Sequence, residues 1–129
     1  MHDAAYGIFS PIVSEQRHLD RQMNRIRDVF TGTINHHRVA MANALNTKDH
    51  RLVVDNGALW SGDWRLELTL QSTIHQVGPC HLVLRRKGSE DHTVLTSFDV
   101  SGSPVSADDL IVKALEEAFQ VFVRMVLAN

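Results

Sequence analysis

Several residue types are scarce in this 129-residue sequence, and each scarcity excludes a class of protein. Cys80 is the sole cysteine, so no disulfide can form within the chain. No uncharged apolar stretch approaches the roughly 18 residues that a membrane-spanning helix needs, so we expect no membrane association. Lys plus Arg number 13 against 15 Asp plus Glu, and the net charge of −2 excludes a uniformly basic nucleic-acid-binding protein, though not a local basic patch.

The rest of the composition is that of an ordinary globular protein. Apolar residues make up 43% and charged residues 22% of the chain, and the length suits one domain over residues 1–129. The first 12 residues lack the basic start of a secretory signal, and Ser10 and Pro11 interrupt their apolar stretch. We therefore expect a single cytoplasmic domain.

The first third of the chain has the apolar period of a helix. A stripe spaced 7, 4, 3 and 4 residues apart predicts a helix over about residues 12–30: Ile12, Leu19, Met23, Ile26 and Phe30. Thr31, Gly32 and Thr33 are expected to interrupt it, because glycine and β-branched residues disfavour helix. A second helix, or a kinked continuation, is expected over residues 34–46.

The middle third has the alternation of an antiparallel sheet. Apolar and polar residues alternate strictly over 64–71, and further β-like runs follow at 81–85 and 93–98. These runs predict a three-strand meander, and a short run at 52–55 before the Asn56-Gly57 turn adds a possible fourth strand. The inward face is predicted to hold Trp64, Leu66, Leu68, Leu70, Leu82, Leu84 and Val94.

The last part of the chain predicts a helix over about residues 107–127. Ser106 is a suitable N-cap, and Asp108 and Asp109 suit the positive end of the helix dipole. Apolar residues cover more than half of the helix circumference, so a second element must pack on it besides the sheet. That element is either the N-terminal helix or the same helix of a second subunit. We expect a homo-oligomer, most simply a homodimer, with interface candidates Phe119, Phe122, Val123 and Val126.

These elements together predict an α+β fold. An N-terminal helix or helix pair precedes an antiparallel meander of three or four strands, and the C-terminal helix packs on one face of the sheet. The other face would be open and polar, and it is the candidate binding site: Thr73, His75, His81, Arg85 and Ser97. A turn centred on Gly78 would place His75 opposite His81, and His81 would lie beside Ser97. Trp60 is a candidate partner contact.

The eight histidines raise the possibility of a metal site, but their spacing does not support one. Neighbouring strand residues such as Cys80 and His81 point to opposite faces, so they cannot share a metal ion. No zinc-binding, nucleotide-binding or nucleophile motif is present, and Cys80 lacks the setting that activates a thiol. We expect no catalytic residue, no metal site and no cofactor, and a histidine-based metal site remains an alternative.

Nucleic-acid binding is a further alternative. Two basic clusters favour it: Arg17, Arg21 and Arg25 along the first helix, and Arg85, Arg86 and Lys87 at a hairpin. The order of helix, three-strand meander and helix also resembles the double-stranded-RNA-binding domain in outline, over about half of the chain. That resemblance implies phosphate contacts from lysines at the start of the second helix, where this chain has Asp108 and Asp109. The preferred hypothesis is a small non-catalytic interaction or ligand-binding module, with a protein as the possible partner.

Overall fold

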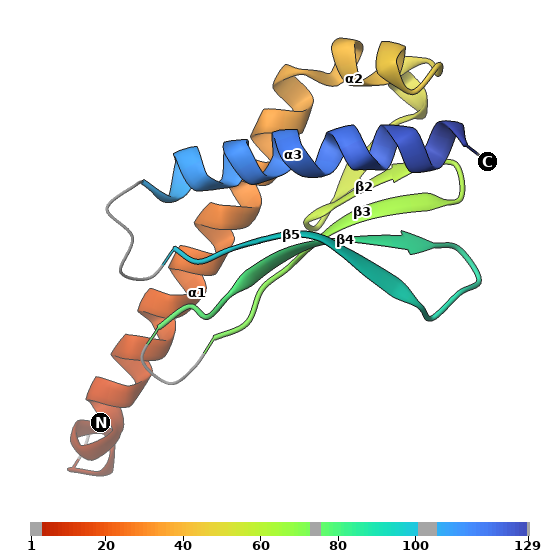
Figure 1. Ribbon diagram of the computed structural model, residues 1–129. Helices are drawn as coiled ribbons and strands as arrows, with labels where there is room; N and C mark the ends of the chain where they lie inside the picture. The colour runs from red at the N-terminus through yellow and green to blue at the C-terminus, as the bar shows by residue number, and fades with distance from the viewer. Residues whose placement is uncertain (1–3, 73–75, 101–105, 129) are drawn as a thin grey trace.

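The computed structural model describes residues 4–72, 76–100 and 106–128, with side chains from residue 14 onward. Its helices are α1 (Ala4–His36), α2 (Arg38–Ala44) and α3 (Ala107–Leu127), with a short 3₁₀ turn at Asp49–Arg51. Its strands are β1 (Val53–Asp55), β2 (Ala58–Ser61), β3 (Trp64–Thr69), β4 (Cys80–Arg86) and β5 (His92–Phe98). The strands form one antiparallel sheet in the order β1-β2-β3-β4-β5, so the predicted α+β fold is confirmed (Figure 1).

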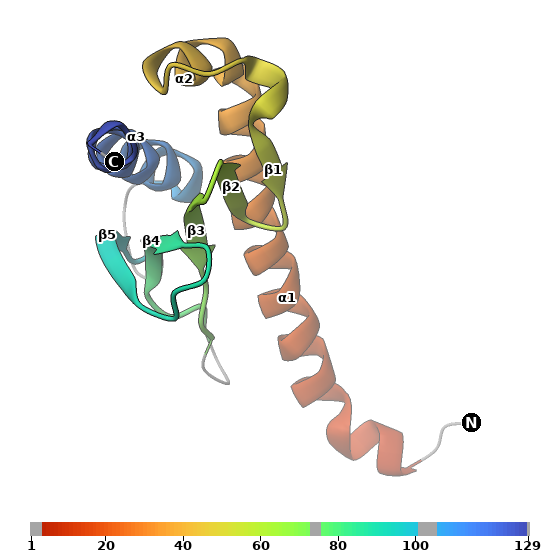
Figure 2. The ribbon, with the colours of Figure 1, turned by 90° about the vertical axis from the view of Figure 1, so that its right-hand side faces the viewer.

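The core lies between one face of the sheet and the two long helices. In Figure 2, α1 passes the β1–β2 side of the sheet and α3 lies over the β5 side. The largest fully buried side chains come from all three parts: Leu19, Ile26, Phe30 and Ile34 of α1, Leu59, Leu66 and Leu82 of the sheet, and Ile111, Leu115 and Phe122 of α3. Because both helices pack on this face, no helix of the described residues covers the other one.

The sheet has five strands, where three or four were predicted. The missed strand is β2, whose four residues lie between two tight turns. At the first turn, Asn56 (φ 48°) and Gly57 (φ 78°) both adopt positive φ, as a two-residue hairpin of type I′ requires. The prediction of a turn at this dipeptide is confirmed, and it joins β1 to β2.

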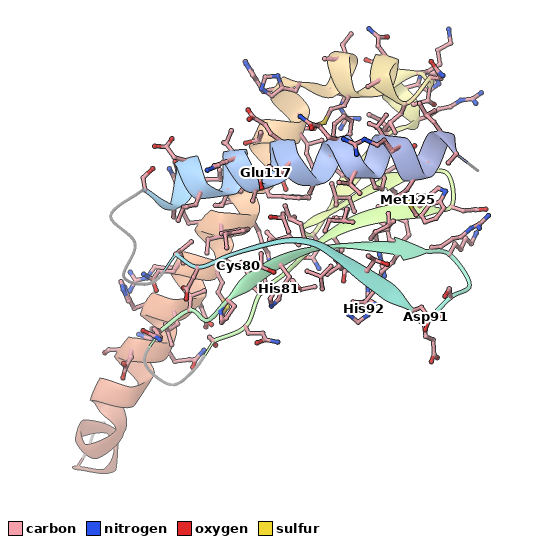
Figure 3. The ribbon with its side chains drawn as sticks, in the orientation of Figure 1. Cys80, His81, Asp91, His92, Glu117 and Met125 are labelled. Carbon is pink, nitrogen blue, oxygen red and sulfur yellow. The ribbon has the colours of Figure 1, made fainter. Side chains whose placement is uncertain are left out.

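The face that each strand presents to the core follows the predicted alternation except in β5. Cys80 is fully buried, whereas His81 and His92 lie on the side of the sheet away from α3 (Figure 3). The inward position of Val94 is wrong, because its side chain is 50% exposed. A register shift in the β4–β5 pairing leaves Leu95 as an extra residue in β5, and Leu95 packs against the core instead.

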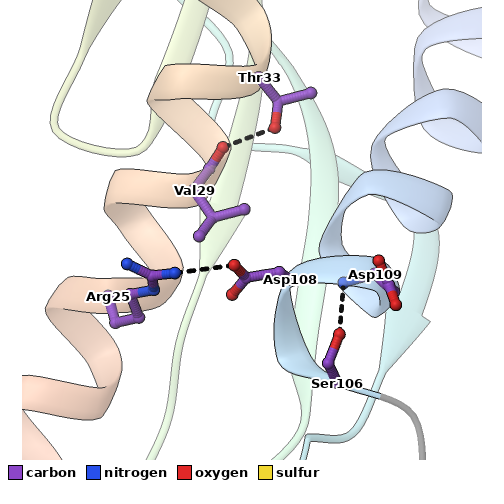
Figure 4. A network of polar contacts seen from close by, with 6 residues as sticks. All are labelled: Arg25, Val29, Thr33, Ser106, Asp108 and Asp109. Atoms are coloured by element: carbon purple, nitrogen blue, oxygen red, sulfur yellow. Dashed lines mark hydrogen bonds and ion pairs between the residues drawn. The ribbon is translucent and has the colours of Figure 1, made fainter.

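Helix α1 continues through the predicted interruption at Gly32 and ends at His36. The hydroxyl of Thr33 donates a hydrogen bond to the carbonyl of Val29 at 2.7 Å, which satisfies its polar group within the helix (Figure 4). Ile34, in the next turn, is fully buried, so tertiary packing outweighs the low helix propensity of this stretch. The chain bends instead at His37, whose ψ is 17°, and α2 follows.

The second element that packs on α3 is α1 of the same chain. Arg25 of α1 and Asp108 at the start of α3 form an ion pair of 2.8 Å, beside the predicted N-cap, where the Ser106 hydroxyl accepts a hydrogen bond from the amide of Asp109 (Figure 4). Phe122 has no exposed surface, and this chain alone buries it. Phe119, Val123 and Val126 are partly buried against the same core, and a role for them between subunits stays a prediction.

Candidate functional site

The strand pairing aligns the side chains of the open face in rows across the sheet. Directly paired residues of an antiparallel sheet point to the same side. One row contains Trp60, Arg65, Arg85 and His92, the next contains Ala58, Glu67, Val83 and Val94, and a third contains Thr69, His81 and Ser97. The open face is therefore cationic and aromatic in one row and polar in another.

His81 lies on this face, but its neighbour is not the predicted one. Its partner on β3 is Thr69, and Ser72 forms an isolated bridge with Val77, so the pairing is not centred on Gly78. The predicted pairing of His75 with His81 is therefore wrong, and His75 and Thr73 themselves lie outside the described residues.

The predicted proximity of His81 and Ser97 is confirmed. The two residues are paired in the sheet, and the Nδ1 atom of His81 lies 2.7 Å from the Ser97 hydroxyl oxygen. Neither residue lines the cationic hollow described next, and Ser97 is exposed. The pair can bind a polar group on the sheet surface.

A hollow of about 230 Å³ lies at one end of the open face. We call it the cationic hollow, and its lining residues are Trp60, Arg65, Arg85, Arg86, Lys87, Gly88 and Ser89. The guanidinium of Arg65 stacks over the Trp60 ring at 4.6 Å, a cation–π contact. Arg86 also borders the hollow, but its guanidinium stacks over the Trp64 ring at 5.1 Å, on the opposite face of the sheet. Three cationic side chains, those of Arg65, Arg85 and Lys87, and one aromatic ring therefore surround the space on the open face.

Glu67 holds two of these arginines. Its Oε1 atom lies 3.2 Å from the Nε of Arg85 and accepts a hydrogen bond from it, and its Oε2 atom lies 3.2 Å from the Nε of Arg65. All three side chains are about three-quarters buried, with exposed fractions of 27%, 28% and 24% for Arg85, Arg65 and Glu67. One carboxylate therefore accepts a hydrogen bond from Arg85 and forms an ion pair with Arg65, whose buried Nε has no hydrogen-bond partner among the described residues.

Arg85 was predicted as a site residue, whereas Trp60 was considered only as a lone partner contact and Arg65 and Glu67 were missed. The signal for them was present in the alternation of residues 64–71. If the even residues of that strand face the core, Arg65 and Glu67 must face the same side as Arg85. Only the β2 strand, which was not predicted, adds Trp60 to this row.

The two basic clusters do not form one surface. Arg25 pairs with Asp108 at the start of α3, whereas Arg86 lines a hollow with Val126 near the end of that helix. Asp108 and Val126 are 18 positions apart, which is about 27 Å along the helix. Nucleic acid would have to bridge this separation to contact both clusters.

Cys80 has the chemistry of a buried structural thiol. Burial, followed by the charge of Asp99, raises the pKa of its thiol from 9.0 to about 11. The thiol is therefore protonated at neutral pH, and a protonated thiol is a poor nucleophile and metal ligand. Within the described residues, no three His, Cys, Asp or Glu side chains are grouped so that they could hold a metal ion.

Comparisons of the chain with family models, curated proteins and solved structures give no match. Among the described residues, no helix has both the length and the apolar character needed to cross a membrane.

Proposed function

We propose that the protein is a non-catalytic binding module that takes an acidic segment of a protein partner on its open sheet face. The observation that carries this proposal is the cationic hollow, where Arg65, Arg85 and Lys87 border one space on the open face. The only carboxylate that contacts this group in the described residues, Glu67, is already engaged by two of the arginines. The three cations exceed it by two, so an incoming carboxylate is attracted.

The surroundings of the hollow suit a protein partner. Val94 and Val53 on the same face are 50% and 53% exposed, and Trp60 is partly exposed. Tryptophan and arginine are the side chains enriched where binding energy is concentrated in protein interfaces. The polar pair His81 and Ser97 extends this surface along the sheet.

A protein partner is favoured over nucleic acid because the cationic side chains of the open face are confined to one hollow. Specific nucleic-acid binding commonly uses several phosphate contacts along a backbone. Here the cations surround one hollow, and the exposed carboxylates of Glu90 and Asp91 follow directly on the same hairpin. Those carboxylates would repel a phosphate backbone that followed the hairpin, whereas a flexible acidic segment can place single side chains in the hollow and lead away from the hairpin.

The test is the binding of a fluorescent decaglutamate peptide, measured by anisotropy at low and moderate salt. Lys87→Glu should weaken binding by about tenfold, because it reverses an exposed charge at the hollow. Arg17→Glu makes the same charge change on α1 and is the matched control, for which less than about a twofold change is expected. No binding to the peptide, or equal loss in both variants, would refute the proposal. Tighter binding of a DNA or RNA duplex than of decaglutamate would favour the nucleic-acid alternative instead.

A further inference from the structure

The paired arginines of the cationic hollow suggest which anionic group it takes. We propose that Arg65 and Arg85, oriented by Glu67, bind the phosphate of a phosphorylated side chain on the partner, an inference that rests on the proposed function. The Nε of Arg85 donates a hydrogen bond to Glu67 at 3.2 Å, and the Nε of Arg65 lies 3.2 Å from Glu67 as an ion pair. No described residue accepts a hydrogen bond from the terminal nitrogens of either group, which leaves both planar forks able to donate.

Charge favours a phosphate over a carboxylate. The three cations of the open face exceed the single contacting carboxylate by two. A phosphate monoester carries about −1.5 to −2 charges and three acceptor oxygens, whereas a carboxylate carries one charge and two oxygens. Arginine forks match phosphate oxygens in pairs, and such charge-assisted hydrogen bonds are the stronger class.

Lys87 and Ser89 can complete the set of donors. Lys87 is exposed at the rim of the hollow and carries three donor hydrogens. The Ser89 hydroxyl oxygen accepts a hydrogen bond from the amide of Asp91 at 3.2 Å, so its own O–H remains able to donate. The hollow thus has hydrogen-bond donors from the strands β3 and β4 and from the β4–β5 hairpin.

The size of the hollow points to a single group on a side chain. Its volume of about 230 Å³ lies below the roughly 300–1,000 Å³ of pockets that enclose a whole small ligand. A phosphoryl group and the end of one side chain fit this space, and the rest of the partner would lie across the open face. The phosphate therefore arrives on a protein segment and not on a free nucleotide.

Glu67 acts here as a positioning residue. Its own negative charge disfavours an anion nearby, so by charge alone Glu67→Gln should tighten phosphate binding. If Glu67 instead orients the two forks, the same substitution should weaken binding although the site becomes more positive. Weaker phosphate binding by Glu67→Gln would indicate that Glu67 positions the arginines, and tighter binding would indicate that its charge only repels the phosphate.

The experiment compares three acidic peptides of one sequence whose central residue is phosphoserine, glutamate or serine, measured by anisotropy with the full chain. Phosphoserine should bind about tenfold more tightly than glutamate, and inorganic phosphate should compete with it. Glu67→Gln and Arg85→Lys should each reduce this preference, with circular dichroism confirming the fold. Arg85→Lys keeps the charge and removes the fork, so it tests the same geometry if Glu67→Gln does not fold.

The outcomes separate the two proposals. Equal affinity for the phosphoserine and glutamate peptides would overturn the phosphate site and leave the proposed function standing. No affinity for any acidic peptide would overturn both. Tighter phosphopeptide binding by Glu67→Gln would show that the forks need no carboxylate to orient them, and would overturn the role given to Glu67.

Discussion

Phe122→Ala tests whether α3 is buried by its own chain. Phe122 is fully buried between α3 and the rest of the core. Removing such a ring costs about 3–5 kcal/mol of unfolding free energy, because both transfer energy and packing are lost. That loss is a large part of the roughly 5–15 kcal/mol that stabilises a typical domain. For a chain of this length, the melting temperature should fall by about 10–20 °C.

The assay is urea denaturation followed by circular dichroism, together with light scattering of the folded protein. Phe119 is the matched control: it lies on the same helix with its ring centre 6.2 Å from that of Phe122, but it is only partly buried. Phe119→Ala should cost about 1–2 kcal/mol, because part of that ring is already in water. If Phe122→Ala left stability unchanged but reduced the molecular mass, a second subunit would be covering α3 and the reasoning would be wrong.

Three further substitutions test local features of the fold. Gly32→Ala should raise the unfolding free energy by about 0.5–1 kcal/mol, because Gly32 is in a helix with nothing within 4 Å of an added Cβ. Gly57→Ala should lower the free energy of unfolding by about 1–2 kcal/mol, because a φ of +78° strains an alanine although space is available. A denaturation series in which Gly57→Ala is more stable than Gly32→Ala would contradict both predictions. The raised pKa of Cys80 predicts that the free energy of unfolding is at its full value below about pH 9. It should fall by up to about 3 kcal/mol as the pH rises through 11, because only the unfolded thiol ionises between those values. Cys80→Ala should lack this component, and parallel pH profiles of the two proteins would rule it out.

The sequence correctly predicted the helices and strands whose local pattern of apolar residues agrees with the side that they bury. The alternation of residues 64–71 correctly assigned Leu66 and Leu68 to the core, and Ser106 correctly marked the start of α3. Helix α1 differed from its prediction because burial of Ile34 outweighs a local preference against helix at Gly32. Helix propensity is a property of each residue by itself, whereas burial depends on contacts between residues far apart in the sequence, which a local pattern does not show.

The candidate site was harder to predict because it depends on register. One extra residue in β5 exchanges the faces of Val94 and Leu95, and no local signal marks such a bulge. The position of the β3–β4 turn likewise decides whether His81 meets His75 or Thr69. Trp60 lies beside Arg65 because β2 pairs with β3. Strand β2 has only four residues, which are too few for an alternating pattern to identify a strand.

The order of the strands has a consequence for how the chain folds during synthesis. Every strand pairs with its neighbour in sequence, so the sheet can form from successive local hairpins. The α1–α3 contacts instead join distant residues, such as Arg25 and Asp108, which are 83 positions apart. At about 5–20 residues per second, translation of the 21 residues of α3 takes on the order of 1–4 s after the strands have been made. During that interval the apolar face around Leu66 and Leu82 lacks the cover that α3 provides.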